Sequence, residues 1–245
     1  MKVAVLISGQ PRFTREFDEF LSKIKNYDQL DFFFYLWNSK PADSEFIPPS
    51  WPDSLDAVRS KILLHLPANS NIARIDIVNQ PPYNPGRSYN LTPWTNEKNM
   101  WYMYYGLKQV NRLREEWEAA NGPYDLVIRA RPDVGVRDSL DCAAMKEFVT
   151  NNPNCVLVPN NHRHGINISV NDMIGVGSSS LMSTYASVLD KMDEYHDAGI
   201  PYHNETLLGH HLNVNNIQYP TNNIEVLFRE YHHPHHGKKD FGNWA

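Results

Sequence analysis

One apolar stretch decides the fold class: Val3-Ala4-Val5-Leu6-Ile7. Its side chains are branched or small and no polar residue interrupts them, which is typical of a strand buried on both faces of a parallel sheet. Further apolar runs alternate along the chain with segments of helical spacing, and this alternation predicts βαβ units. The sequence therefore predicts an α/β fold, in which helices flank a mostly parallel twisted sheet within a single domain.

Hydrophobic periodicity places the individual elements. Strands are predicted at 3–7, 32–37, 72–78, 126–130, 156–158, 173–176 and 224–228, and helices at 13–24, 55–66, 95–120, 181–192 and 206–212. The helix at 95–120 is the clearest, because Met100, Leu107, Val110 and Trp117 share one face, which we expect to cover the sheet. Asn121-Gly122-Pro123 predicts where it ends.

Composition narrows the class of protein. The 245 residues carry a formal net charge of -5, which argues against a nucleic-acid partner, because phosphate backbones require clustered excess Lys and Arg. No apolar stretch approaches the roughly 20 residues that a membrane span needs. Cys142 and Cys155 form no spaced metal motif, and they predict reduced thiols in a cytoplasmic protein.

Polar residues follow the first two predicted strands. Ser8, Gly9, Gln10 and Arg12 come after the first strand, and Trp37 ends the second. In open α/β sheets ligands bind beyond the carboxyl ends of the strands, so we expect these side chains to converge on a ligand. Gly9 would let backbone amides approach it, and Arg12 would meet a phosphate. The alternative is an ordinary strand-to-helix turn with Arg12 in solvent.

The segment Asp125-Leu126-Val127-Ile128-Arg129-Ala130-Arg131-Pro132-Asp133 is the most informative. Arg129 and Arg131 lie two residues apart, so on a strand they point the same way and could hold a carboxylate or a diphosphate. Asp133 follows the strand, where a carboxylate can bind a hard cation beside phosphate oxygens. The alternative is a cluster of salt bridges that closes the sheet edge.

The second half offers weaker candidates. Asp172 precedes a short predicted strand, and Glu205 and His211 lie around a short predicted helix. The spacing of Glu205, His210 and His211 does not fit a zinc-protease motif, and the histidines suit either the core or a site. The histidines at 232–236 are expected to lie in solvent.

With these segments collected, the sequence resembles GT-A-fold glycosyltransferases, whose sheet is Rossmann-like. It is similar to small glycosyltransferase-like proteins of phages, large DNA viruses and bacterial polysaccharide clusters. The resemblance is carried by the segments 3–12, 124–133, 171–172 and 204–212 and by the strand that ends at Trp37. It implies a nucleoside-diphosphate-sugar donor bound across the ends of the first strands, and transfer of its sugar to a glycan or other hydroxyl acceptor.

The resemblance also implies roles for single residues. Asp133 matches the last aspartate of the family's Asp-x-Asp motif, which holds a divalent metal, Mn or Mg, on the diphosphate. Arg131 stands where that motif has its first aspartate, so an arginine could neutralise the diphosphate directly. Asp172 and Glu205 are the candidate catalytic carboxylates, and His211 is a candidate metal ligand beside Asp133.

The resemblance divides the single domain, 1–245, into a nucleotide-binding half at 1–135, an acceptor half at 136–231 and a tail at 232–245. The leading hypothesis is a nucleotide-sugar-dependent glycosyltransferase in the cytoplasm, or in the host cytoplasm if the protein is viral. Two alternatives stay open. The first is a nucleotide- or carbohydrate-binding module without catalysis on the same fold. The second is a metal-dependent hydrolase.

Overall fold

The computed structural model describes residues 1–10, 15–37, 56, 59–60, 62–63, 66–67, 69–83, 85, 87–89, 96–160, 169–222, 224 and 226–228. Arg12 and the tail at 232–245 lie outside the described residues, as does half of the helix predicted at 55–66. The predictions made for them therefore stay predictions.

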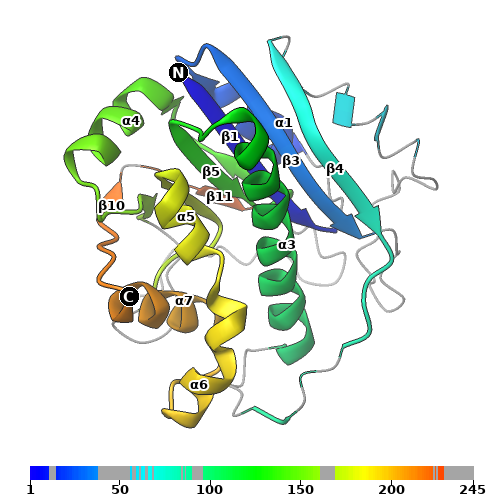
Figure 1. Ribbon diagram of the computed structural model, residues 1–245, viewed down its shortest axis with the longest axis vertical. Helices are drawn as coiled ribbons and strands as arrows, with labels where there is room; N and C mark the ends of the chain where they lie inside the picture. The colour runs from blue at the N-terminus through cyan, green and yellow to red at the C-terminus, as the bar shows by residue number, and fades with distance from the viewer. Residues whose placement is uncertain are drawn as a thin grey trace, which may run out of the picture.

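A five-stranded sheet in the order β4-β3-β1-β5-β9 forms the centre (Figure 1). Its parallel strands are β1 (Lys2–Gly9), β3 (Gln29–Trp37), β4 (Ser70–Val78) and β5 (Leu126–Ala130), and β9 (Ile174–Gly177) runs antiparallel to β5. The predicted α/β fold with a mostly parallel sheet is confirmed. Successive strands are added outwards from β1 to β4, and the chain then returns to add β5 on the other side of β1. The pair β1–β5 is therefore the switch point of the sheet, where ligands bind in such folds.

Helices cover both faces of the sheet (Figure 1). α1 (Arg15–Lys23) buries Phe20 in the core on one face, and α3 (Glu97–Asn121) buries Leu107 in the core on the other. The predicted inner face of α3 is confirmed, although Trp117 is only partly buried, where its ring meets the edge of the Phe33 ring.

α3 approaches the sheet most closely at Gly106. A Cβ atom at this position would lie 3.3 Å from the Cβ of Ser8 and 3.6 Å from the Trp37 ring. The missing side chain therefore allows close packing of the helix against the ends of β1 and β3. This packing brings the first turns of α3 to the carboxyl ends of the parallel strands.

The remaining elements are short. They are β2 (Ile24–Lys25), β6 (Val134–Val136), β7 (Leu140–Asp141), α4 (Cys142–Asn151), β8 (Val158–Pro159), α5 (Ser179–Tyr185), the 3-10 helix η1 (Val188–Lys191), α6 (Met192–Asp197), α7 (Asn204–Val214), β10 (Thr221–Asn222) and β11 (Val226–Phe228). The last predicted strand, at 224–228, does not join the main sheet, because β11 pairs antiparallel with β6.

The single helix predicted at 181–192 is wrong, because the chain breaks it into α5, η1 and α6. Ser187 turns the backbone between α5 and η1. Its N–H donates to the carbonyl of Thr184 at 3.0 Å, and its hydroxyl donates to the same carbonyl at 2.8 Å. A hydroxyl that competes for a backbone carbonyl favours such a tight turn over a continuous α-helix.

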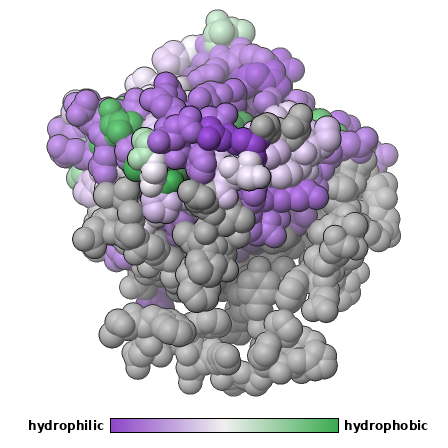
Figure 2. Space-filling model, turned by 90° about the horizontal axis from the view of Figure 1, so that it is seen from below, coloured by the Kyte–Doolittle hydropathy of each residue, from purple (hydrophilic) through white to green (hydrophobic). Residues whose placement is uncertain are grey.

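The described surface gives no sign of a membrane span. None of the described helices is both long and apolar enough to cross a bilayer. Seen from below, where the arrowheads of β3 and β4 lie in Figure 1, the described surface is mostly hydrophilic (Figure 2). Cys142 and Cys155 are buried and unpaired, and burial raises the pKa of the Cys142 thiol to about 12.

Candidate functional site

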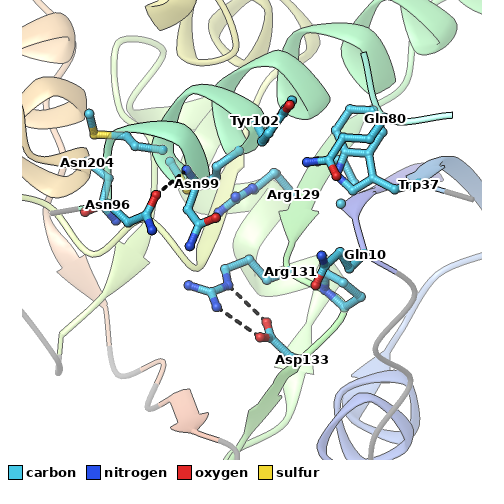
Figure 3. A pocket seen from close by; sticks show the side chains of 15 residues that line it. Gln10, Trp37, Gln80, Asn96, Asn99, Tyr102, Arg129, Arg131, Asp133 and Asn204 are labelled. Carbon is cyan, nitrogen blue, oxygen red and sulfur yellow. Dashed lines mark hydrogen bonds and ion pairs between the residues drawn. The ribbon is translucent and has the colours of Figure 1, made fainter. Parts of the chain in front are cut away.

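A cavity of about 290 Å³ lies at the switch point, at the carboxyl ends of β1, β3 and β5 (Figure 3). The first turns of α3 and the first residue of α7 complete its wall. The described residues that line it are Ser8, Gly9, Gln10, Trp37, Gln80, Asn96, Asn99, Met100, Tyr102, Met103, Arg129, Arg131, Pro132, Asp133 and Asn204. Apart from Arg12, the residues proposed for nucleotide-sugar binding are thus brought together.

The backbone at the end of β1 needs glycine. At Gly9 the φ angle is 118°, a conformation that L side chains rarely adopt. Trp37 ends β3 on the other side of the cavity and is 3% exposed. The rings of Tyr35, Tyr102 and Tyr105 pack around its indole, so Trp37 offers the cavity a rigid aromatic edge.

Arg131 and Asp133 form a two-pronged ion pair in the cavity wall. Arg131 Nε donates to Asp133 Oδ1 and Arg131 Nη2 donates to Asp133 Oδ2, each at 3.0 Å. Asp133 is 5% exposed, whereas the Arg131 side chain is 27% exposed and faces the cavity. Such parallel hydrogen bonds fix the plane of the guanidinium, so Asp133 orients Arg131. The salt bridge considered as an alternative exists, but it belongs to the cavity wall.

Arg129 differs from Arg131 in having no ion-pair partner among the described residues. It is 2% exposed, and its Nε and Nη1 atoms have no hydrogen-bond partner in the described part of the chain. A guanidinium keeps its proton at any physiological pH. Buried donors without acceptors cost free energy, so the arrangement favours an anionic ligand that would supply the acceptors.

The strand beside Arg129 leaves room for the Tyr185 ring. Arg129 is the register partner of Gly175 in β9, and a Cβ atom on Gly175 would lie 2.9 Å from Cζ of Tyr185. The Tyr185 ring therefore packs directly over the glycine. Burial raises the pKa of Tyr185 to about 12, and the positive charge of Arg129 opposes this shift.

The two predicted catalytic carboxylates lie behind the cavity wall. Asp172 and Glu205 are 2% and 3% exposed, and neither is among the described residues that line the cavity. Asp172 Oδ2 accepts a hydrogen bond of 2.9 Å from Nδ2 of Asn204, which does line it. Burial raises the pKa of Tyr104 well above its usual value; Asp172 and Glu205 add to this shift and Arg129 opposes it. Asp172 is thus placed to position Asn204, not to contact a ligand directly.

The structure does not bring His211 to Asp133. His211 Nε2 lies 2.7 Å from the carbonyl oxygen of Thr184, so it carries the proton, and Nδ1 accepts from the Tyr195 hydroxyl at 2.7 Å. Burial lowers the pKa of this imidazole. Both ring nitrogens are occupied, which corrects the expectation that His211 binds a metal and assigns it to the core between α5 and α7.

The described residues do not fit the divalent ion that the resemblance implies. No group of three His, Cys, Asp or Glu side chains that could hold a metal occurs among them. Asp133 is the one carboxylate among the described lining residues, and both of its oxygens accept from Arg131. The guanidinium groups of Arg129 and Arg131 would instead supply the positive charge that the resemblance assigns to a metal.

Sequence reasoning missed the amide side chains of the wall: Gln80, Asn96, Asn99 and Asn204. Asn96 caps α3, since its Oδ1 accepts from the backbone N–H of Asn99 at 3.0 Å. A capping asparagine before a strongly periodic helix is a recognisable signal of a helix start. That signal could have placed the start of α3, but only the packing at Gly106 shows that this start faces a cavity.

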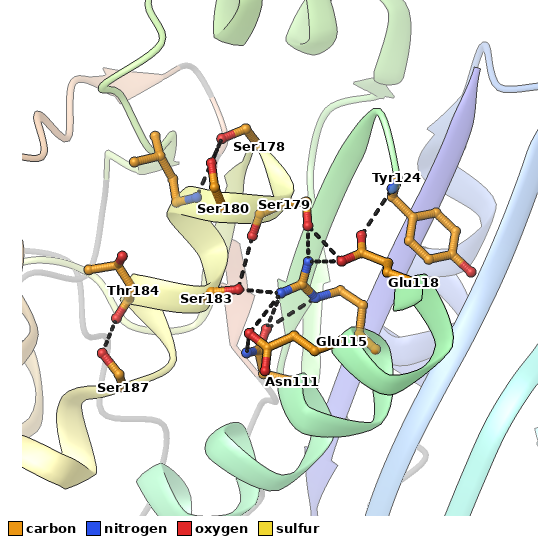
Figure 4. A network of polar contacts seen from close by, with 12 residues as sticks. Asn111, Glu115, Glu118, Tyr124, Ser178, Ser179, Ser180, Ser183, Thr184 and Ser187 are labelled. Atoms are coloured by element: carbon orange, nitrogen blue, oxygen red, sulfur yellow. Dashed lines mark hydrogen bonds and ion pairs between the residues drawn. The ribbon is translucent and has the colours of Figure 1, made fainter. Parts of the chain in front are cut away.

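A second buried arginine lies outside the cavity, and its partners Asn111, Glu118 and Ser183 come from α3 and α5 (Figure 4). Arg114 is fully buried, and it donates to Asn111 Oδ1 at 2.8 Å, to Ser183 Oγ at 2.7 Å and to Glu118 Oε2 at 2.9 Å. It also donates to the hydroxyl of Ser179. These contacts fasten α3 to α5.

Two comparisons with known proteins add no relative. No protein-family model matches the chain, and no curated protein matches it either. The geometry of the cavity is therefore what indicates a function.

Proposed function

We propose that the protein binds a nucleoside-diphosphate sugar in the cavity at the switch point and transfers the sugar to a hydroxyl acceptor. The single observation that carries this proposal is Arg129, a buried guanidinium with open donors beside Arg131 and Asp133. Two arginines against one carboxylate leave the wall with an excess positive charge. A diphosphate has the charge and the several acceptor oxygens that such a pair favours.

The arginines would act on the leaving group. In the transfer, the bond between the anomeric carbon and the diphosphate oxygen breaks as the oxygen of the acceptor hydroxyl bonds to that carbon, and the hydroxyl proton passes to the departing diphosphate. Negative charge then grows on the departing diphosphate, and preorganised donors stabilise it without reorganisation. Asp133 would hold Arg131 in the plane that this requires, and Arg129 would contribute from the floor of the cavity. No step is assigned to a metal, because the described donor set does not form a metal site.

A binding module without catalysis is the second candidate. The observation in its favour is that Asp172 and Glu205 lie behind the wall and that Asp133 is paired with Arg131, so the described lining presents no unpaired carboxylate as a base. Both candidates predict nucleotide binding, and only the first predicts turnover. Both are also compatible with the cytoplasmic location that we propose. No described group supports the hydrolase alternative.

The experiment has two stages. Titration calorimetry with uridine, guanosine, adenosine and thymidine diphosphates tests binding, with and without manganese. Transfer from, or hydrolysis of, the matching nucleotide sugars then tests catalysis. We expect one diphosphate to bind with an affinity that is the same with manganese and with chelator. If none of the four diphosphates binds, the proposed function is wrong.

Asp133→Asn tests the role given to Asp133. The amide has the shape of the carboxylate but offers one acceptor and no charge, so Arg131 loses its fixed plane. We expect turnover to fall about tenfold or more, equally with and without manganese. A variant that loses activity together with a manganese response of the wild type would instead make Asp133 a metal ligand. Wild-type turnover in the variant would mean that the pair of Arg131 and Asp133 is only a structural salt bridge.

A further inference from the structure

The cavity is not uniform along its length. In Figure 3, Asn96, Asn99 and Asn204 gather at one end, and Trp37 and Gln80 lie at the other. The arginines lie between these ends. Amide side chains lie at both ends, and the Trp37 end also presents an aromatic ring. From that end, the order of the aromatic ring, the arginines and the asparagines matches the order of parts in a nucleoside-diphosphate sugar, so the asparagine end would face the position of the transferred group.

Asn96 offers this end of the cavity a donor. Its Oδ1 accepts from the backbone N–H of Asn99 at 3.0 Å, which fixes which side of the amide is oxygen. Among the described residues, none forms a hydrogen bond with the amide nitrogen Nδ2 of Asn96. The helix cap thus holds an N–H donor pair at the cavity.

Asn204 offers an acceptor. Its Nδ2 donates to the buried carboxylate of Asp172 at 2.9 Å, and a carboxylate can only accept, so the orientation of this amide is also fixed. The side-chain oxygen of Asn204 accepts no hydrogen bond from the described residues. Asn204 is held a second time where its backbone carbonyl accepts from the Tyr104 hydroxyl at 2.6 Å.

We infer that this uncharged donor–acceptor pair selects a neutral, hydroxyl-bearing sugar. A hydroxyl both donates and accepts, so neighbouring sugar hydroxyls satisfy Asn96 and Asn204 together. A sugar carboxylate only accepts, and would leave the oxygen of Asn204 facing a negative charge. The inference depends on the proposed function and adds to it the class of donor: a hexose and not a hexuronic acid.

Asn96→Ser tests the inference without breaking the helix. Serine caps a helix about as well as asparagine, so the stability is retained, but its short side chain carries no amide donor to the cavity. The matched control is Asn213→Ser, on α7 and outside this cavity. The probes are the nucleoside diphosphate that binds, its hexose conjugate and, for uridine, UDP-glucuronic acid.

We expect the hexose conjugate to bind wild-type protein about tenfold more tightly than the bare diphosphate. One or two neutral hydrogen bonds to the sugar are enough to give a difference of this size. Asn96→Ser should remove most of this ratio and leave the affinity for the diphosphate within about twofold, and Asn213→Ser should change neither. An equal loss for both probes in Asn96→Ser would overturn the inference, as would tighter binding of UDP-glucuronic acid than of UDP-glucose. Failure of every diphosphate to bind wild-type protein is a different result, which refutes the proposed function itself.

Discussion

The two buried arginines of this molecule have opposite surroundings. Arg114 is fully enclosed, and side chains from α3 and α5 accept from its Nε, Nη1 and Nη2 (Figure 4). Arg129 is almost as buried, yet its Nε and Nη1 have no acceptor in the described chain (Figure 3). A buried charge that the protein satisfies itself is part of the fold. A buried charge that it leaves unsatisfied beside a cavity is suited to a ligand.

The largest effect is expected at Arg114. Arg114→Ala removes the cationic partner of Glu118, whose side chain is only 12% exposed, and leaves an empty space between α3 and α5, so it should lower the free energy of unfolding by about 3–5 kcal/mol. Chemical denaturation measures this directly. Arg112→Ala on the same helix is the control, because Arg112 pairs with Glu116 in a half-exposed position and such pairs contribute at most about 1 kcal/mol. Equal losses in the two variants would mean that burial does not distinguish these arginines.

Arg129→Met should have the reverse effect. Methionine fills a similar volume without charge, so the variant should unfold no more easily than wild type, and the free energy of unfolding should rise by about 1–3 kcal/mol. Diphosphate binding should weaken by about 1.5–3 kcal/mol, the range for a hydrogen bond to a charged group. Calorimetry and denaturation on one preparation test both. A variant that is destabilised as strongly as Arg114→Ala would show that Arg129 is also structural.

Gly175→Ala tests the space around Arg129. The added methyl group would collide with the Tyr185 ring, and overpacking of this kind costs about 1–3 kcal/mol of stability. The displaced ring should also weaken diphosphate binding, because Tyr185 packs over Gly175, the register partner of Arg129. If the variant is destabilised but its affinity for the diphosphate is unchanged, Tyr185 does not contribute to the binding site.

The smallest effect is expected at Ser183. Ser183→Ala removes one acceptor of Arg114, at 2.7 Å, and leaves the others in place. The loss of stability should be about 0.5–1.5 kcal/mol, the net value of one hydrogen bond, with diphosphate binding unchanged. A loss as large as that of Arg114→Ala would mean that the network fails as a unit, which a double-mutant cycle with Ser179→Ala would measure.

The sheet could be predicted because buried parallel strands are continuous apolar runs. The apolar runs at 3–7 and 32–37 were enough to predict two buried strands. The buried face of α3 followed from the helical spacing of its apolar residues. Two features could not be predicted. The direction of β9 depends on pairing with a distant strand, and the break before η1 depends on a single hydroxyl, that of Ser187.

The site could be predicted in part for a related reason. The carboxyl ends of parallel strands share one edge, so strand position alone indicated that Ser8, Trp37 and Arg131 would meet. Asn204 and Asp172 carried no such signal, because their contact joins the start of a helix to a loop. His211 was predicted as a metal ligand because the sequence does not show whether the ring nitrogens of a histidine already have partners in the core.

The close packing of α3 at Gly106 joins the helix to strand ends that are synthesised early, so the parts of the site are made at different times during translation. The strand ends that hold Ser8 and Arg131 are complete once β5 has left the ribosome, and the helix beside them has already been made. Asn204 and the strand that carries Gly175 emerge later. A chain that ends before α7 therefore carries Arg129 and Arg131 but lacks Asn204, one of the two amides proposed to select the sugar. Under the proposed function, both parts of the selection are present only in a chain that includes α7.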